Sequence, residues 1–148
     1  MRVALVTKHL FRSKGLLLKN CVVAIVGGGT LGRRIALMWG SMGRPVMLAD
    51  TVAKIRTDVL AFYQANIDER IKHMGSSSAG HLEVVDDAAL AVKDAWLVIE
   101  AIPERLELKR NLFRQLEETA PPDAILATNS SSFKSRELVT LMKDASRG

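Results

Sequence analysis

The chain has 148 residues, a length that suits one domain with its own hydrophobic core and is short for two. Hydrophobic residues make up 48% and charged residues 25%, the balance of a globular chain. No apolar run approaches the ~20 residues of a membrane span. A single cysteine, Cys21, excludes an internal disulfide and a cysteine-based metal cluster, and we predict no metal site.

The net charge of +5 is concentrated near the amino terminus. Residues 1–49 hold eight of the 21 basic side chains and none of the 16 acidic ones. Residues 1–20, basic and apolar without acids, have the composition of an ordinary amino-terminal arm or of a mitochondrial targeting segment. We expect a cytoplasmic protein, with a mitochondrial one as the alternative. Aromatic residues are only 5% and no basic run occurs, so we expect no nucleic acid as a partner. Because no apolar run is long enough for a membrane span, we expect no membrane partner either.

Strand-like and helix-like segments alternate along residues 21–148. Short apolar runs rich in β-branched residues predict buried strands, and apolar residues at helical spacing predict helices. The predicted strands are 21–26, 45–49, 82–85, 96–101 and 124–128, and the predicted helices are 30–42, 52–74, 88–92, 104–119 and 135–142. The alternation predicts an α/β fold with a doubly wound parallel sheet of the Rossmann type, preceded by an arm at residues 1–20.

The first predicted turn reads GGGTLG, in which Gly27, Gly29 and Gly32 meet the pattern G-x-G-x-x-G. The pattern lies between an apolar strand and a helix, the context in which it binds a dinucleotide. Gly27 permits a tight turn, Gly29 lets backbone N–H groups approach a pyrophosphate, and Gly32 lets the helix pack on the strand. Thr30 and Leu31 are the first residues of the predicted helix, and their unpaired N–H groups can bind phosphates.

Asp50 ends the second predicted strand, 18 residues after Gly32. A carboxylate there can accept hydrogen bonds from the adenosine ribose and repels a 2′-phosphate, which favours NAD over NADP. The alternative interpretation is a glycine turn made only for packing, with Asp50 as a cap for the helix that follows.

Polar side chains at the ends of two later strands form a second group. Glu104 and Lys109 follow the fourth predicted strand, and Asn129 and Ser131 follow the fifth. Because the carboxyl ends of parallel strands line the ligand crevice, we expect these residues at the same edge as the glycine turn. Alternatively, Glu104 is a first-turn helix acid and residues 129–132 are a polar turn.

The order of these motifs resembles the amino-terminal domain of the 3-hydroxyacyl-CoA dehydrogenases over residues 21–140. The matching features, in chain order, are GGGTLG, Asp50, E-A-I-P-E, Lys109, LF and ATNSSS. The resemblance implies that NAD is the cofactor, with residues 27–32 at its phosphates and Asp50 at its ribose.

The resemblance also implies roles for the second group. Glu104 and Lys109 would lie along the nicotinamide half of NAD. Ser131 would contact both the nicotinamide side and the 3-oxygen of the substrate, and Asn129 would shape that pocket. We therefore predict Ser131, Asn129 and Glu104 as the candidate catalytic residues.

The catalytic base of that family is a histidine on the strand after the closing helix, followed by a helical domain. This sequence ends at Gly148, about where that strand should begin. We expect none of His9, His73 and His81 to replace the base, because of their positions in the arm and around the serine-rich segment 75–80. An absent general base typically costs ~10²–10⁴ in rate, so we expect inefficient oxidation by this chain alone.

Three functions are compatible with the sequence. The first is NAD-dependent oxidation of a 3-hydroxyacyl thioester in fatty acid metabolism. The second is a stand-alone relative recruited to isomerisation or cyclisation in secondary metabolism, with Ser131, Asn129 and Glu104 for acid–base work. The third is a non-catalytic NAD-binding or assembly module. A missing second domain would expose apolar surface, so we expect a homodimer that associates around Leu138, Val139, Leu141 and Met142.

Overall fold

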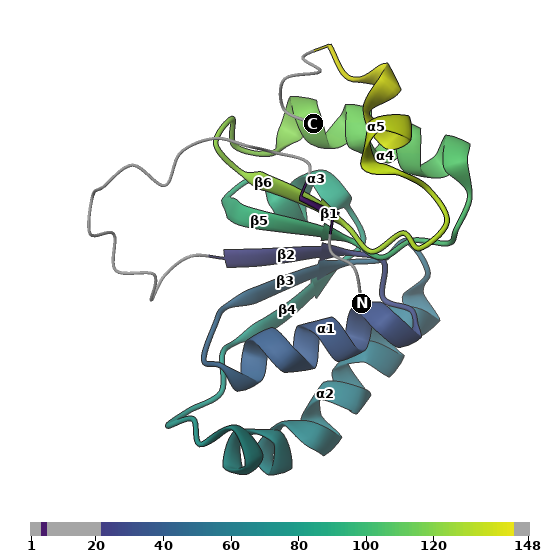
Figure 1. The fold of residues 1–148 in the computed structure, drawn as a ribbon. Helices are drawn as coiled ribbons and strands as arrows, with labels where there is room; N and C mark the ends of the chain where they lie inside the picture. The colour runs from purple at the N-terminus through teal and green to yellow at the C-terminus, as the bar shows by residue number, and fades with distance from the viewer. Residues whose placement is uncertain (1–3, 6–21, 144–148) are drawn as a thin grey trace.

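A six-stranded sheet forms the middle layer of the computed structural model, which describes residues 4–5 and 22–143 (Figure 1). The strands are β1 (Ala4–Leu5), β2 (Val22–Val26), β3 (Val46–Ala49), β4 (Leu82–Val85), β5 (Ala95–Glu100) and β6 (Ile125–Thr128). Their order in the sheet is β1-β6-β5-β2-β3-β4. Strands β2 to β6 run parallel to one another, and β1 pairs antiparallel with β6.

Helices cover both faces of the sheet. Their bounds are α1 (Thr30–Ser41), α2 (Ala53–Met74), α3 (Ala88–Val92), α4 (Leu106–Thr119) and α5 (Ser135–Leu138), followed by the 3-10 turn η2 (Val139–Leu141). Figure 1 shows α1 and α2 on one face and α3, α4 and α5 on the other. The predicted doubly wound α/β fold is confirmed. Within the described residues, no helix combines the length and the apolar composition that a membrane span requires.

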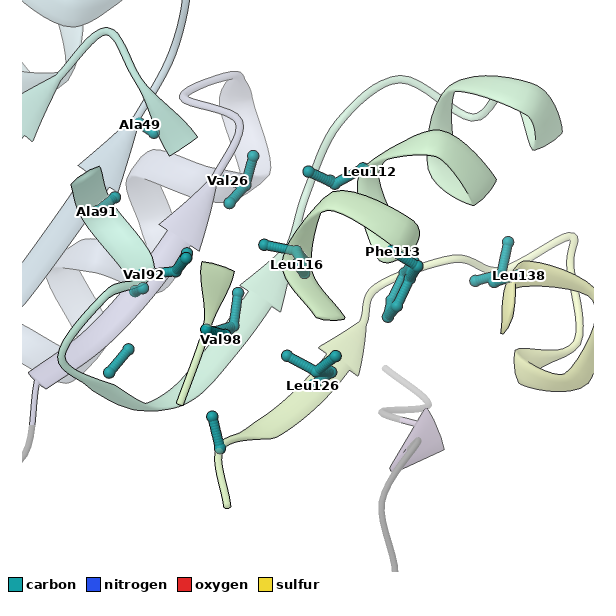
Figure 2. Close-up of a cluster of buried hydrophobic side chains, with 14 of the residues drawn as sticks. Val26, Ala49, Ala91, Val92, Val98, Leu112, Phe113, Leu116, Leu126 and Leu138 are labelled. Atoms are coloured by element: carbon teal, nitrogen blue, oxygen red, sulfur yellow. The ribbon is translucent and has the colours of Figure 1, made fainter. Parts of the chain in front are cut away.

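The core explains why the strand sequences are continuous apolar runs. Val23 to Val26 of β2 are all buried, because helices pack on both faces of this central strand. On one face, Phe113 and Leu116 of α4 belong to the same cluster as Val98 of β5 and Leu126 of β6 (Figure 2). Burial of each such side chain contributes about 1.5–3 kcal/mol to folding.

The carboxyl ends of β2 and β5 meet at the point where the chain reverses its course across the sheet. From β2 the chain winds outward through β3 to β4, and then returns to β5 on the other side of β2. Helices leave β2 and β5 on opposite faces, so the loops after these two strands diverge. In open parallel sheets this divergence creates the crevice where ligands bind.

The structure differs from the predicted arm at residues 1–20 in one respect. Ala4 and Leu5, inside the predicted arm, form the edge strand β1 beside β6. A two-residue strand has too few residues to show the alternation that identifies strands in a sequence. The predicted boundary between residues 20 and 21, together with Cys21 and His9, lies outside the described residues.

The closing helix differs from the prediction over 135–142. The α-helix ends at Leu138 and a 3-10 turn continues to Leu141. Val139 and Thr140 are β-branched residues with low helix propensity, which shortens the α-helical part. The other predicted elements agree with the structure to within two residues at each end.

The predicted self-association face is wrong as to its residues. Leu138, Val139 and Met142 are buried in the core cluster that contains α4, and only Leu141 of the four is exposed, at 43%. The apolar face of α4 within the same chain covers these side chains. Self-association itself stays a prediction.

Candidate functional site

A cavity of about 580 Å³ lies at the carboxyl ends of the strands. This volume is within the range of small-molecule sites, about 300–1,000 Å³. Across the sheet from β4 to β6, the cavity is lined successively by Asp86, Asp50, Gly27, Glu104 and Asn129, each of which follows a different strand. The glycine turn is therefore in the middle, with Asp50 toward one end and Glu104 and Asn129 toward the other.

The glycine turn needs glycine at two positions for steric reasons. Gly27 has a φ of 107°, and a Cβ there would lie 2.6 Å from the carbonyl oxygen of Ala101. A Cβ at Gly32 would overlap the carbonyl oxygen of Gly27. These two glycines bring the start of α1 close against the turn, as predicted for them.

Gly29 differs, because a Cβ there would meet no atom of the described residues within 4 Å. Gly29 is the N-cap of α1, and no side chain caps this helix and no acidic residue lies in its first turn. The first N–H groups of the helix are thus open to a ligand, and the helix dipole favours an anion there. Bare backbone at Gly29 and an uncapped helix start at Thr30 and Leu31 fit the phosphates of a dinucleotide.

Gly28 has a role that the sequence interpretation missed. A Cβ there would lie 2.8 Å from Ile55 Cγ2 and 3.0 Å from Val59 Cγ2, so Gly28 allows α2 to approach the turn. Its N–H also donates to Asp50 Oδ2 at 2.7 Å. In the sequence, Gly28 could have been noticed because it is a glycine at a position where the pattern G-x-G-x-x-G does not require one.

Asp50 links the end of β3 to the glycine turn. Besides the bond from Gly28, its Oδ1 accepts from the Val52 N–H at 2.9 Å, and Arg56 donates to its backbone carbonyl at 2.8 Å. Each carboxylate oxygen has a further lone pair for a ligand hydroxyl. The N-cap of α2 is Val52, which has no side-chain cap, so the alternative role of Asp50 as a helix cap is wrong.

Lys109 is buried between two carboxylates. Its ammonium lies 2.6 Å from Glu100 Oε1 and 3.0 Å from Glu104 Oε2, and 3.4 Å from the carbonyl oxygen of Ile102. The side chains of Lys109 and Glu100 are 1% and 0% exposed. Lys109 was correctly expected near Glu104, but its three N–H donors are all directed at protein acceptors.

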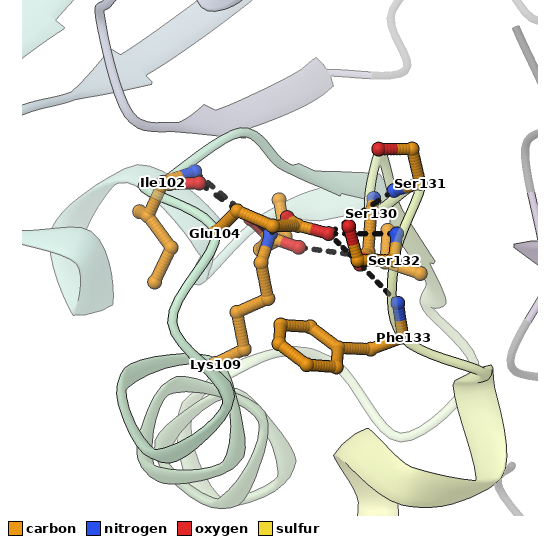
Figure 3. Close-up of polar contacts among 9 residues, drawn as sticks. Ile102, Glu104, Lys109, Ser130, Ser131, Ser132 and Phe133 are labelled. Carbon is orange, nitrogen blue, oxygen red and sulfur yellow. Dashed lines mark hydrogen bonds and ion pairs between the residues drawn. The ribbon is translucent and has the colours of Figure 1, made fainter.

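Glu104 binds the loop that follows β6 (Figure 3). Its Oε1 accepts from the hydroxyl of Ser130 and from the N–H groups of Ser131, at 3.2 Å, and Ser132, at 3.0 Å. Partial desolvation, the largest influence, raises the pKa of Glu104. The hydrogen bonds from Ser130, Ser132 and Lys109 and the charge of Lys109 together outweigh it, and lower the pKa to about 2. A carboxylate with so low a pKa is a weak proton acceptor at neutral pH, and the acid–base role of Glu104 stays a prediction.

Because the pKa of Glu104 is lowered in the folded protein, we expect its contribution to the free energy of unfolding to depend on pH. Its ordinary value is 4.5 and its folded value about 2, so the stabilisation is complete above about pH 4.5 and is lost as the pH falls toward 2. We expect the difference in unfolding free energy between the wild type and Glu104→Gln to be constant from about pH 8 to 5 and to shrink below that. Urea denaturation across this range measures it, and a difference that is unchanged near pH 2.5 would contradict the assignment.

Asn129 and Ser131 differ from each other in their position relative to the cavity. Asn129 lines the cavity, as predicted. Ser131 is exposed and is not among the cavity-lining residues; its N–H bonds Glu104, while its hydroxyl points away from that carboxylate (Figure 3). Within the described residues, neither His73 nor His81 lines the cavity, and no three His, Cys, Asp or Glu side chains are grouped to hold a metal ion.

Three buried polar residues of the site were not predicted. Glu100 accepts from the Thr128 hydroxyl at 2.6 Å, Thr128 accepts from the Ser130 N–H at 3.0 Å, and Ser130 bonds Glu104. Glu100 and Thr128 are directly paired in the register of β5 and β6. A polar residue that ends an apolar strand was the signal available in the sequence.

Comparison with known proteins agrees with this geometry. The family model for the 3-hydroxyacyl-CoA dehydrogenase NAD-binding domain matches residues 22–148. The 3-hydroxyadipyl-CoA dehydrogenase of Escherichia coli is 38% identical over 133 residues, which cover 84% of this chain and 27% of that protein. The mitochondrial hydroxyacyl-coenzyme A dehydrogenase of Mus musculus is 32% identical over 158 residues, which cover 89% of this chain and 48% of that protein.

Solved structures give the same result. The crystal structure of 3-hydroxybutyryl-CoA dehydrogenase from Escherichia coli has a TM-score of 0.74 at 34% identity, covering 88% of this chain and 29% of that one. This chain spans 27% and 48% of the two curated relatives, in each case less than half. The match gives NAD as the cofactor of the domain. The chain belongs to the 3-hydroxyacyl-CoA dehydrogenase family and carries its NAD-binding domain.

Proposed function

We propose that this domain binds NAD along the carboxyl edge of its sheet and serves the NAD-dependent oxidation of a 3-hydroxyacyl-CoA thioester. One observation carries the proposal: a single cavity joins Asp50, the bare start of α1, and the polar group of Glu104 and Asn129. The first two features fit a ribose and a pyrophosphate. The third is then adjacent to the nicotinamide end, where the reaction takes place.

The residues of this chain would divide the work by position. Asp50 would accept from the ribose hydroxyls, and the N–H groups after Gly29 would bind the phosphates. Bound NAD supplies a hydride acceptor. Asn129 lines the reacting end of the cavity, and we assign to the exposed Ser131 hydroxyl the binding of the substrate 3-oxygen. Glu104 holds the loop that carries both residues, and Lys109 holds Glu104.

The relatives support the proposed substrate class. Two of them are named for 3-hydroxyadipyl-CoA and 3-hydroxybutyryl-CoA, which share a 3-hydroxyacyl thioester and differ in the acyl group. A CoA thioester with a hydroxyl or carbonyl at C3 is therefore the substrate class we propose. A role in fatty acid metabolism, a cytoplasmic location and a homodimer are parts of the same proposal.

Calorimetric titration with NAD tests the cofactor site. We expect one molecule of NAD to bind per chain, and Asp50→Asn to weaken binding at least about tenfold, because an amide cannot accept from both Gly28 and Val52 and also from the ribose. Asp58→Asn, an exposed change on α2, is the control and should bind as the wild type. No heat with the wild type would contradict the proposal. NADH oxidation with acetoacetyl-CoA then tests the substrate class.

A further inference from the structure

Four hydrogen-bond donors from two separate segments converge on the carboxylate of Glu104. One oxygen faces the hydroxyl of Ser130 and the N–H groups of Ser131 and Ser132, and the other faces the ammonium of Lys109 (Figure 3). Backbone N–H groups in a concave turn, with a hydroxyl and a cation, form a typical binding site for a carboxylate. Here the protein fills that site with one of its own side chains.

Two of the four donors, those of Lys109 and Ser130, are held independently of Glu104. Lys109 is fixed by its 2.6 Å ion pair with the buried Glu100. Ser130 is held through its N–H by Thr128, which bonds Glu100 in turn. The ammonium of Lys109 and the first part of the loop, at Ser130, are therefore positioned by Glu100 and Thr128 at the ends of β5 and β6.

The rest of the loop depends on Glu104. The N–H groups of Ser131 and Ser132 both have Glu104 Oε1 as their acceptor, and the Ser130 hydroxyl that bonds this oxygen also accepts from Phe133 at 3.1 Å. Residues 129–134 form no helix or strand. The Glu104 carboxylate is thus the common acceptor that holds this turn between Asn129 and α5.

We propose that Glu104 is a positioning residue whose carboxylate fills a carboxylate site, partly built without it by Lys109 and Ser130, and thereby holds the loop of residues 129–133, and that the emptied site binds a free small carboxylate. Glu104→Ala removes one methylene and the carboxylate, which together correspond to acetate. Acetate should therefore replace the missing group. The binding of acetate does not depend on NAD, whereas an effect on NAD affinity rests on the proposed function.

Thermal unfolding with added salt tests the site. We expect the Tm of Glu104→Ala to rise with sodium acetate in a saturable way, beyond the change seen with sodium chloride at equal ionic strength or with the neutral acetamide. The wild type and Glu104→Gln should respond equally to acetate and chloride, because their side chains already fill the site. Glu107→Ala, which removes an exposed carboxylate paired with Arg110 on α4, should also show no specific response. Equal shifts with acetate and chloride in Glu104→Ala would overturn the proposal.

Hydrogen exchange tests the positioning role of Glu104 without added acetate. In Glu104→Gln we expect the amides of Ser131 and Ser132 to exchange at least about tenfold faster, since a neutral acceptor binds them more weakly than a carboxylate. Amides of β5 should keep their wild-type rates. Unchanged exchange at Ser131 and Ser132 would overturn the proposal. If Glu104→Ala is unfolded in chloride, acetate should restore its far-ultraviolet circular dichroism, and failure to do so would count equally against it.

NAD affinity separates this inference from the proposed function. Glu104→Ala should bind NAD more weakly than the wild type, and acetate should restore several-fold of the loss. If the wild type binds no NAD while acetate specifically stabilises Glu104→Ala, the proposed function fails and the carboxylate site stands. If the wild type binds NAD but acetate has no specific effect on Glu104→Ala, the carboxylate site fails alone.

Discussion

Gly32→Ala should lose NAD binding and much of its stability, whereas Gly29→Ala should bind NAD more weakly with little change in stability. A methyl group at Gly32 overlaps the carbonyl oxygen of Gly27, and backbone on both sides must move to admit it. We expect a loss of about 3 kcal/mol in the free energy of unfolding, the upper part of the range for overpacking. NAD binding should become undetectable, because the same movement displaces the turn.

In the part of the chain that the structure describes, no atom lies within 4 Å of a methyl group at Gly29, and the φ of −59° is accessible to alanine. We expect its stability to stay within about 1 kcal/mol of the wild type, the cost of a poorer N-cap. Its NAD affinity should fall at least about tenfold, because the methyl group occupies the space where a pyrophosphate approaches the backbone. Urea denaturation and calorimetry on both variants give the four values. Wild-type affinity in Gly29→Ala would show that the phosphates bind elsewhere.

Lys109→Met should destabilise the domain by about 3–5 kcal/mol. The change leaves Glu100, which is fully buried, without its cation, and an uncompensated buried charge is costly in this range. Methionine fills much of the space of the lysine side chain, so that packing alone does not account for the loss.

A double-mutant cycle with Glu100→Gln isolates the charge effect. The doubly substituted protein should be more stable than the sum of the two single losses indicates, with a coupling of about 2 kcal/mol or more. The Thr128 hydroxyl can still donate to the side-chain amide oxygen at position 100 in Glu100→Gln, so the contact between the ends of β5 and β6 is kept. Urea denaturation of the four proteins gives the coupling. Additive losses would mean that the Lys109–Glu100 pair does not account for the cost.

The glycine turn and its acid were predictable because they are local features. The tight turn at Gly27, the close approach at Gly32 and the position of Asp50 at a strand end each depend on a few neighbouring residues and on strand–turn–helix order. Gly28 was missed because its partners, Ile55 and Val59, are on a helix that begins 25 residues later. Only the packing of α2 against the turn shows why a third small residue is needed.

The polar group at the other end of the cavity was predictable only in outline. Chain order places Glu104 and Asn129 at one edge of a parallel sheet, and the structure confirms that placement. The sequence did not show that the carboxylate of Glu104 is held by Ser130 to Ser132, or that its pKa is lowered. Those contacts join residues 26–28 positions apart and require β5 and β6 to be neighbours.

By itself the sequence determined the fold class, the order and bounds of most elements, and the glycine turn with Asp50, because periodicity and turn chemistry act over a few residues. Only the tertiary structure decided that Lys109 is enclosed by Glu100 and Glu104, that Glu104 holds the loop after β6, and that Leu138, Val139 and Met142 belong to the core of this chain. The physical reason is the same in each case. Burial and ion pairing depend on which strands and helices become neighbours, and that is set by the packing of the whole sheet.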